Sequence, residues 1–342
     1  MSRGEAAGAS RAGSTGASRA TIVAGLAVGI AAISTSPILV RAAAMPALAL
    51  AFWRCLAGAV LLAPFAWAGR ARRPVAGGVR GTPEGCPGEP GGVRPEDRGP
   101  EGSPEPGERA RLLAAGTCLA VHFALFNASL SFTTVASSAT LVSCAPLFVG
   151  LGGRLLGEPP THRAWLGIAL AVAGAVVIGL GDAGALDLGG RALLGDAMAF
   201  AGSAAMAGYL LLGRVARRRL PLAAYAATVY GVAAAVLLPA CLLTGAALGG
   251  YRAGAWLALA AIVAGPQLLG HTVFNGLLAS VSATVVAVAI LTEPVGATIL
   301  AWLLLDELPA DAFWLGAPPV LAGIWLAATG ERAGLPAAPA GS

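Results

Sequence analysis

Long apolar stretches separated by short polar segments dominate the sequence. Most of these stretches reach or approach the roughly 20 residues that a helix needs to cross a hydrocarbon core of about 30 Å. The alternating pattern of a membrane β-barrel is absent, and lipid tolerates only helices or closed barrels, because unpaired backbone groups cannot be solvated there. We therefore predict an all-α integral membrane protein with ten transmembrane helices, at Thr21–Val40, Ala47–Ala68, Leu112–Phe132, Val135–Leu156, Ala164–Leu180, Ala192–Leu212, Pro221–Ala247, Ala255–Ala279, Ser282–Leu305 and Ala312–Ala328.

Composition agrees with this pattern. The chain is 57% hydrophobic and 11% charged, which is too little polar surface to coat a soluble globule of this size. The first apolar stretch is long and has no clear small-residue cleavage site before its polar end, so we expect a membrane span there and not a cleaved signal peptide. A lipid bilayer is the expected environment.

Arginines are distributed unevenly between the alternate loops. One set of loops and tails holds most of them, and the other holds only Arg41, Arg191 and Arg252. The arginine-rich side is predicted to be cytoplasmic, so we expect a multi-pass protein of the cell membrane with both tails, residues 1–19 and 330–342, in the cytoplasm. Insertion topology thereby explains the formal net charge of +5, and we expect no nucleic-acid partner.

Residues 70–111 are dense in Gly, Pro, Glu and Arg and almost without apolar residues. Such a composition cannot build a packed core, so we expect a disordered cytoplasmic insertion. Its eight arginines and seven acidic residues leave it nearly neutral. The near-neutral charge favours a dispensable insertion over an electrostatic docking segment.

Two parts of the chain share an internal repeat. Asn127 precedes Pro146 by nineteen residues, and Asn275 precedes Pro294 by the same nineteen. In each copy a Trp-Leu-Gly tripeptide follows, with a further glycine seven residues beyond: Gly167 and Gly174 in the first copy, Gly316 and Gly323 in the second. One repeat unit explains both series.

Each unit contains five predicted spans, at residues 20–181 and 192–329. Five is an odd number, so the second copy must start on the opposite side of the membrane, and the fold is predicted as two inverted five-helix repeats. Inverted repeats are a device of secondary transporters, because two such units can open a midplane site alternately to either side. The architecture thus favours alternating access over a continuous channel.

Several sequence motifs resemble those of a known protein family. The run Leu291–Val295, continuing to Leu305–Glu307 and Trp314–Gly316, resembles the second EamA domain of the drug/metabolite transporter superfamily. The first half, with Pro46 and Phe52–Arg54, resembles the first EamA domain. The likeness covers nearly all of Thr21 to Ala328 apart from the insertion. It implies a ten-helix bundle with a central cavity that moves metabolites such as amino acids, or drugs, across the cytoplasmic membrane.

Placing an ionisable side chain at membrane depth costs free energy, so such residues usually have a function. Arg54 lies about 12 Å into its span at 1.5 Å per residue, and Glu293 lies near the middle of its own. One hypothesis is that Arg54 binds a substrate carboxylate while Glu293 titrates or pairs with it. The alternative is a structural clamp, in which Arg54 bonds a glutamate or backbone carbonyls and fixes helix packing.

His122 and His271 occupy nearly equivalent places in the third and eighth spans, each followed by a Phe-Asn pair that contains Asn127 or Asn275. The matching positions of these residues in the two repeats indicate that they line a cavity. A histidine can relay protons, and the alternative is a histidine that is hydrogen-bonded to a neighbouring helix. Pro146 and Pro294, which each remove a backbone donor, are expected to kink or gate their spans.

We considered non-transport functions as well. The three histidines have no hydrolase or zinc-ligand spacing, the five cysteines show no metal-ligand pairing, and no ATP-binding P-loop is present. We therefore expect no metal, no cofactor and no enzymatic activity. The prediction is a secondary transporter that exports a small metabolite or drug, and the alternative is an intramembrane enzyme, such as a serine protease, or a scaffold. The sequence leaves homodimer formation open.

Overall fold

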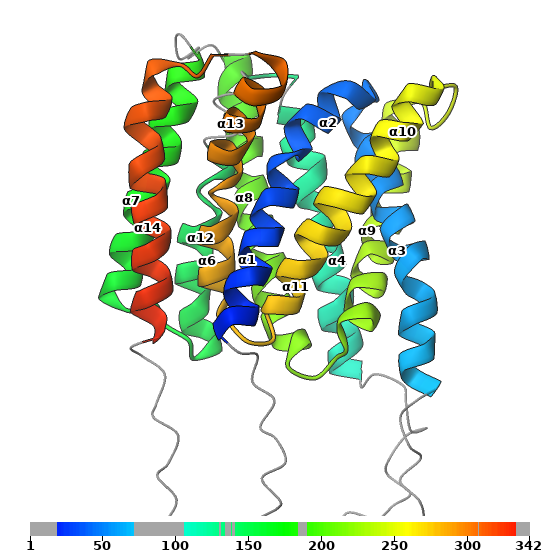
Figure 1. Cartoon of the computed structure of the whole chain (residues 1–342). Coiled ribbons are helices and arrows are strands. Elements are labelled where there is room, and N and C mark those ends of the chain that lie inside the picture. The colour runs from blue at the N-terminus through cyan, green and yellow to red at the C-terminus, as the bar shows by residue number, and fades with distance from the viewer. Residues whose placement is uncertain are drawn as a thin grey trace, which may run out of the picture.

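The computed structural model describes residues 19–71, 106–129, 131–133, 138, 141–183, 190–306 and 308–332. Every regular element in these residues is a helix, and the helices stack side by side into one bundle (Figure 1). In chain order they are α1 (Arg19–Ser34), α2 (Ser36–Ala43), α3 (Ala47–Ala71), α4 (Pro106–Ser129), α6 (Ala145–Gly153), η2 (Arg154–Leu156), α7 (His162–Ala183), α8 (Gly190–Arg217), α9 (Leu222–Thr244), α10 (Ala253–Ile262), η3 (Val263–Thr272), α11 (Val273–Leu277), α12 (Ala283–Ile290), α13 (Glu293–Leu305) and α14 (Asp311–Arg332).

Eight helical stretches in the described residues are long and apolar enough to cross a membrane. The fourth and fifth predicted spans coincide with shorter apolar helices, Ala145–Leu156 and His162–Ile178. Large apolar side chains such as Phe65, Trp67 and Leu243 point outward from the bundle, as lipid-facing positions should. The chain is therefore a multi-pass, all-helical membrane protein.

The predicted insertion is shorter at both ends than we expected, since α3 continues to Ala71. Helix α4 begins at Pro106, so residues 106–111, which we assigned to a disordered loop, are helical. Proline is favoured at a first helical position, since its missing N–H would be unpaired there anyway. The rest of the insertion, 72–105, and most of both tails, 1–18 and 333–342, lie outside the described residues.

Three helices are interrupted in the same way. A residue just before the break closes a tight i→i−3 backbone bond: Thr35 to Ala32, Cys144 to Leu141 and Thr292 to Ala289. A new helix then starts with proline in its first turn, at Pro37 in α2, Pro146 in α6 and Pro294 in α13. Because proline cannot donate to the preceding turn, it ends one helix and is tolerated at the start of the next.

The eighth span contains a π-helical stretch, η3, between α10 and α11. Pro266 lies within η3 and lacks the N–H of a regular helix. Thr272 stabilises the wider turn, because its Oγ1 donates to the carbonyl of Gln267, five residues earlier, at 3.0 Å. Such π-bulges are frequent at functional sites, and this one adjoins the candidate site described below.

Helices α7 and α14 cross at the glycines of the internal repeat. A Cβ atom on Gly167 would lie 2.5 Å from the carbonyl oxygen of Gly323, and one on Gly174 would lie 2.5 Å from that of Gly316. The earlier glycine of one helix meets the later glycine of the other, so the two helices run antiparallel and lie side by side (Figure 1). Corresponding positions of the two repeats thus contact each other reciprocally.

Candidate functional site

Arg54 is the most deeply buried charge described in the bundle. Its side chain projects from α3 and is only 7% exposed. Its Nε donates to Gln267 Oε1 at 2.8 Å, and its guanidinium carbon lies 5.0 Å from the ring centroid of Phe123. The Nη2 nitrogen has no hydrogen-bond partner. A buried cation with an unused donor is prepared to bind an anion, because leaving that donor unpaired is costly.

Three other ionisable side chains surround Arg54. Glu293, His122 and His271 all lie within electrostatic range of its guanidinium. Glu293 is the first residue of α13, immediately after the break at Thr292. Arg54 and Glu293, both described, form no ion pair, so α3 and α13 bring the two charges near each other without joining them.

The rings of both histidines lie close to that of Phe123. The His122 ring centroid is 5.3 Å from that of Phe123, and the His271 centroid is 6.5 Å away. His122 is buried, and its Nδ1 lies 3.0 Å from the carbonyl oxygen of Gly202 in α8. This contact is the hydrogen bond to a neighbouring helix that is the alternative to proton relay. His271 remains partly exposed, so it is the more accessible of the two.

The two asparagines of the repeat have different environments. Asn127 Nδ2 donates to the carbonyl of Ala47 at 3.1 Å, which ties the end of α4 to the start of α3. Asn275 is 1% exposed and belongs to a buried polar network. Asn127 and Asn275 therefore have different structural roles, although they occupy equivalent positions of the repeat.

The hydrogen bonds of this network all donate in the same direction, from Tyr209 toward Gln267. Tyr209 Oη donates to Asn275 Oδ1 at 2.5 Å, and Asn275 Nδ2 donates to Tyr230 Oη at 3.3 Å. Thr272 uses its only hydroxyl hydrogen on the carbonyl of Gln267, so Tyr230 must be the donor in the 3.0 Å contact between Tyr230 and Thr272. The chain of bonds ends at the residue that holds Arg54.

We expect an Asn275→Leu variant to be less stable by about 1–3 kcal/mol, because the Tyr209 hydroxyl loses its acceptor inside the bundle. The measurement is thermal unfolding of the purified protein in detergent. A double variant that adds Tyr209→Phe should recover part of the loss, since removing both partners of a buried hydrogen bond is nearly neutral. Equal stability of Asn275→Leu and the native chain would show that the network contributes nothing.

Gln267, Tyr209, Tyr230 and Thr272 were missed from the sequence. The signal was available for Gln267, since an amide within an apolar span needs a partner just as the histidines do. Tyrosine and threonine are common in membrane helices, and nothing in their spacing distinguishes these members from others.

The structure places the remaining predicted residues as follows. Pro146 and Pro294 each follow a helix break at corresponding positions of the repeat. Two serines that a serine protease could have used, Ser129 and Ser138, are bonded to each other, with their Oγ atoms 2.5 Å apart. Within the described residues, no three His, Cys, Asp or Glu side chains lie close enough to hold a metal ion.

A hollow of about 330 Å³ lies between α3 and the α10–η3 stretch, lined by residues such as Leu61, Trp256 and Leu268. It contains none of the polar residues described above, and its lining is apolar. A polar solute therefore has no partner there, so the residues around Arg54 form the candidate site.

A buried cation, a nearby carboxylate and broken helices inside an apolar bundle are features that membrane transporters use to bind solutes. Comparison with known families agrees: residues 19–180 and 193–329 match the EamA-like transporter family as two EamA repeats. The chain belongs to this family, and hence to the drug/metabolite transporter superfamily.

Two individual proteins are similar to it. One is the "Uncharacterized transporter YwfM" of Bacillus subtilis (strain 168), which is 25% identical over 233 residues, covering 64% of this chain and 73% of that protein. The other is a solved structure described only as "Crystal structure of protein", with a TM-score of 0.72 and 17% identity, covering 92% of this chain and 99% of that one. At this identity the second comparison shows a shared fold alone.

Proposed function

We propose that this protein is a secondary transporter that exports a small metabolite, such as an amino acid or a related compound, or a drug, by alternating access. The observation that carries the proposal is the unpartnered Nη2 of Arg54, buried in the bundle beside Glu293. A transporter must bind its solute away from both surfaces, and polar groups inside an apolar bundle are the means of doing so.

The substrate we infer carries a carboxylate or another anionic group. Arg54 Nε is occupied by Gln267, whereas Nη2 is free to donate to an anion in the plane of the guanidinium. Glu293 offers a second contact, either to a cationic group of the solute or as a carrier of a proton. Its partial exposure and its place at the start of α13 keep it accessible beside the helix break.

The antiparallel crossing of α7 and α14 supports the inverted arrangement of the two repeats. Reciprocal contact between matched glycines is what a pseudo-twofold axis between two units produces. Two units related in this way can exchange conformations, which would open the site first to one side and then to the other. The arginine bias of the loops favours cytoplasmic termini in the cell membrane.

We expect transport to depend on a proton gradient, and a Glu293→Gln variant to lose that dependence. Uptake and efflux of labelled amino acids and related metabolites would be followed in proteoliposomes, with and without an imposed gradient. Asp311→Asn, which removes an exposed carboxylate from the first turn of α14, is the matched control and should behave as the native chain does. Gradient-dependent flux by Glu293→Gln would contradict the coupling role of Glu293.

No flux of any solute in a broad panel, from protein that is verified as folded, would count against transport itself. That result would favour the non-transport alternatives, an intramembrane enzyme or a scaffold.

A further inference from the structure

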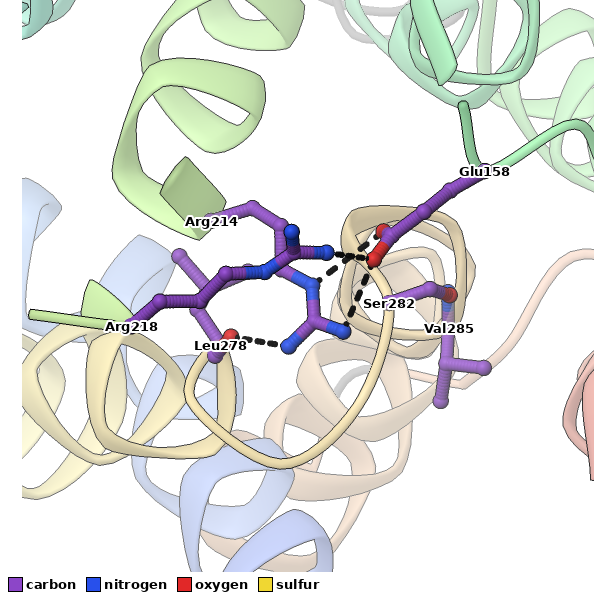
Figure 2. Close-up of polar contacts among 6 residues, drawn as sticks. All are labelled: Glu158, Arg214, Arg218, Leu278, Ser282 and Val285. Carbon is purple, nitrogen blue, oxygen red and sulfur yellow. Dashed lines mark hydrogen bonds and ion pairs between the residues drawn. The ribbon is translucent and has the colours of Figure 1, made fainter. Parts of the chain in front are cut away.

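A second cluster of charges lies at the end of the bundle where α1 begins and α14 ends, which we call the terminal end and which is at the bottom of Figure 1. Glu158 accepts two bonds from Arg214, from Nε to Oε2 at 3.2 Å and from Nη2 to Oε1 at 3.0 Å. Arg218 bonds the same carboxylate. Figure 2 shows Arg214, from the last turn of α8, and Arg218, from the turn that follows α8, both reaching Glu158. This paired geometry is the strong form of an arginine–carboxylate contact.

The cluster joins the two repeats. Glu158 belongs to the first matched segment, whereas Arg214 and Arg218 belong to the second. Gly157 turns the chain with φ +70°, a left-handed conformation that glycine adopts without strain. That turn ends η2 and aims Glu158 back toward α8.

Arg214 also holds the end of α11, together with Arg217. Arg214 Nη1 donates to the carbonyl of Leu278 at 2.7 Å, which Figure 2 shows on the side of the guanidinium away from Glu158. Arg217 Nε donates to the carbonyl of Asn275 at 3.0 Å. The last carbonyls of a helix have no partner within it, so α8 supplies the donors that α11 lacks.

The stretch from Gln267 to Leu278 therefore touches both charged sites. One end accepts the hydrogen bond from Arg54, and the other end is fastened by Arg214 and Arg217. Much of the stretch is π-helical, a form that commonly marks places where a helix adjusts for function. A change around Arg54 thus has a continuous physical connection to the terminal end.

We infer that the cluster of Glu158, Arg214 and Arg218 is a gate that closes the terminal end of the transport path and opens once in each cycle. The inference rests on the proposed function. The side chains of Arg214 and Glu158 are 13% and 24% exposed, so water can solvate both charges when the pair separates. A fully buried pair would leave uncompensated charges on opening, whereas this one can open reversibly.

The test uses a reporter cysteine at the buried start of α12. Ala283 is 3% exposed and follows Ser282, the N-cap of α12, whose hydroxyl accepts from the backbone nitrogen of Val285. Ala283→Cys would be placed in a chain whose five native cysteines are replaced by alanine. The rate of labelling by a membrane-impermeant maleimide would be measured in lipid nanodiscs, where the reagent reaches both faces.

We expect Glu158→Gln and Arg214→Gln each to raise the labelling rate by about fivefold or more, the lower end of typical coupling between linked sites. The double variant should raise it by less than the two single effects combined, because both changes remove the same Glu158–Arg214 contact. Arg219→Gln, which removes an exposed charge from the same turn, is the matched control and should leave the rate unchanged. If Arg214→Gln does not elute as a single folded species, Arg218→Gln takes its place.

Labelling needs no solute, so it separates the gate from the transport function. Unchanged labelling in the Glu158 and Arg214 variants, alongside normal flux by the native chain, would overturn the gate and leave transport intact. Additive increases in the double variant would also overturn it, because they indicate general loosening. A third outcome is that the variants raise labelling non-additively while the native chain carries no solute. That outcome would support closure of the terminal end by the cluster and contradict the proposed transport.

Discussion

An Arg54→Ala variant is expected to lose transport by about 10- to 100-fold while the bundle stays folded. A charge-assisted hydrogen bond to a substrate anion contributes about 1.5–3 kcal/mol, and every 1.4 kcal/mol corresponds to a factor of about ten. The measurement is initial flux in proteoliposomes. Arg252→Ala, which removes an exposed arginine before α10, is the control and should transport as the native chain does.

A substitution of Arg54 also distinguishes the two roles that the sequence left open, a structural clamp and a substrate-binding group. If Arg54 is a structural clamp, replacing it by methionine should lower the unfolding temperature, because Gln267 Oε1 loses its donor. If Arg54 binds substrate, Arg54→Met should abolish flux with unchanged or raised stability, since burying an arginine carries a desolvation cost that methionine avoids. Full flux by the methionine variant would contradict the substrate role.

The largest loss of stability is expected from Gly167→Ala or Gly174→Ala. A new Cβ on Gly167 would lie 2.5 Å from the carbonyl oxygen of Gly323 and 2.6 Å from the backbone nitrogen of Ala327. Backbone atoms cannot rotate out of the way, so α7 and α14 would have to separate. Overpacking costs typically about 1–3 kcal/mol, and we expect the upper end of that range or a failure to fold.

Thermal unfolding in detergent and the yield of monodisperse protein measure this effect. Gly231→Ala in α9 is the matched control, because its new Cβ would have an ordinary contact, 3.8 Å from Ala59. Alanine is a better helix former than glycine by about 1 kcal/mol, so the control should be as stable as the native chain or more so. Equal stability of Gly167→Ala and Gly231→Ala would mean that the helices cross less closely than described.

The amino-acid sequence by itself determined the class of protein, eight of the predicted helical spans and the repeat. Span length is set by the thickness of the bilayer, so it is a one-dimensional property that can be counted along the chain. The nineteen-residue spacing from Asn127 to Pro146 and from Asn275 to Pro294 likewise needs no structure. A buried arginine at Arg54 was conspicuous because charge is rare inside a span.

Only the tertiary structure decided which side chains meet. The partner of Arg54, Gln267, is 213 residues away along the chain, and Glu158 bonds Arg214 across the two repeats. In a soluble helix the apolar stripe identifies the buried face. A membrane helix is apolar toward lipid and toward its neighbours alike, so hydrophobic periodicity does not say which face turns inward. The packing of α7 on α14 and of α11 on α8 supplied that information.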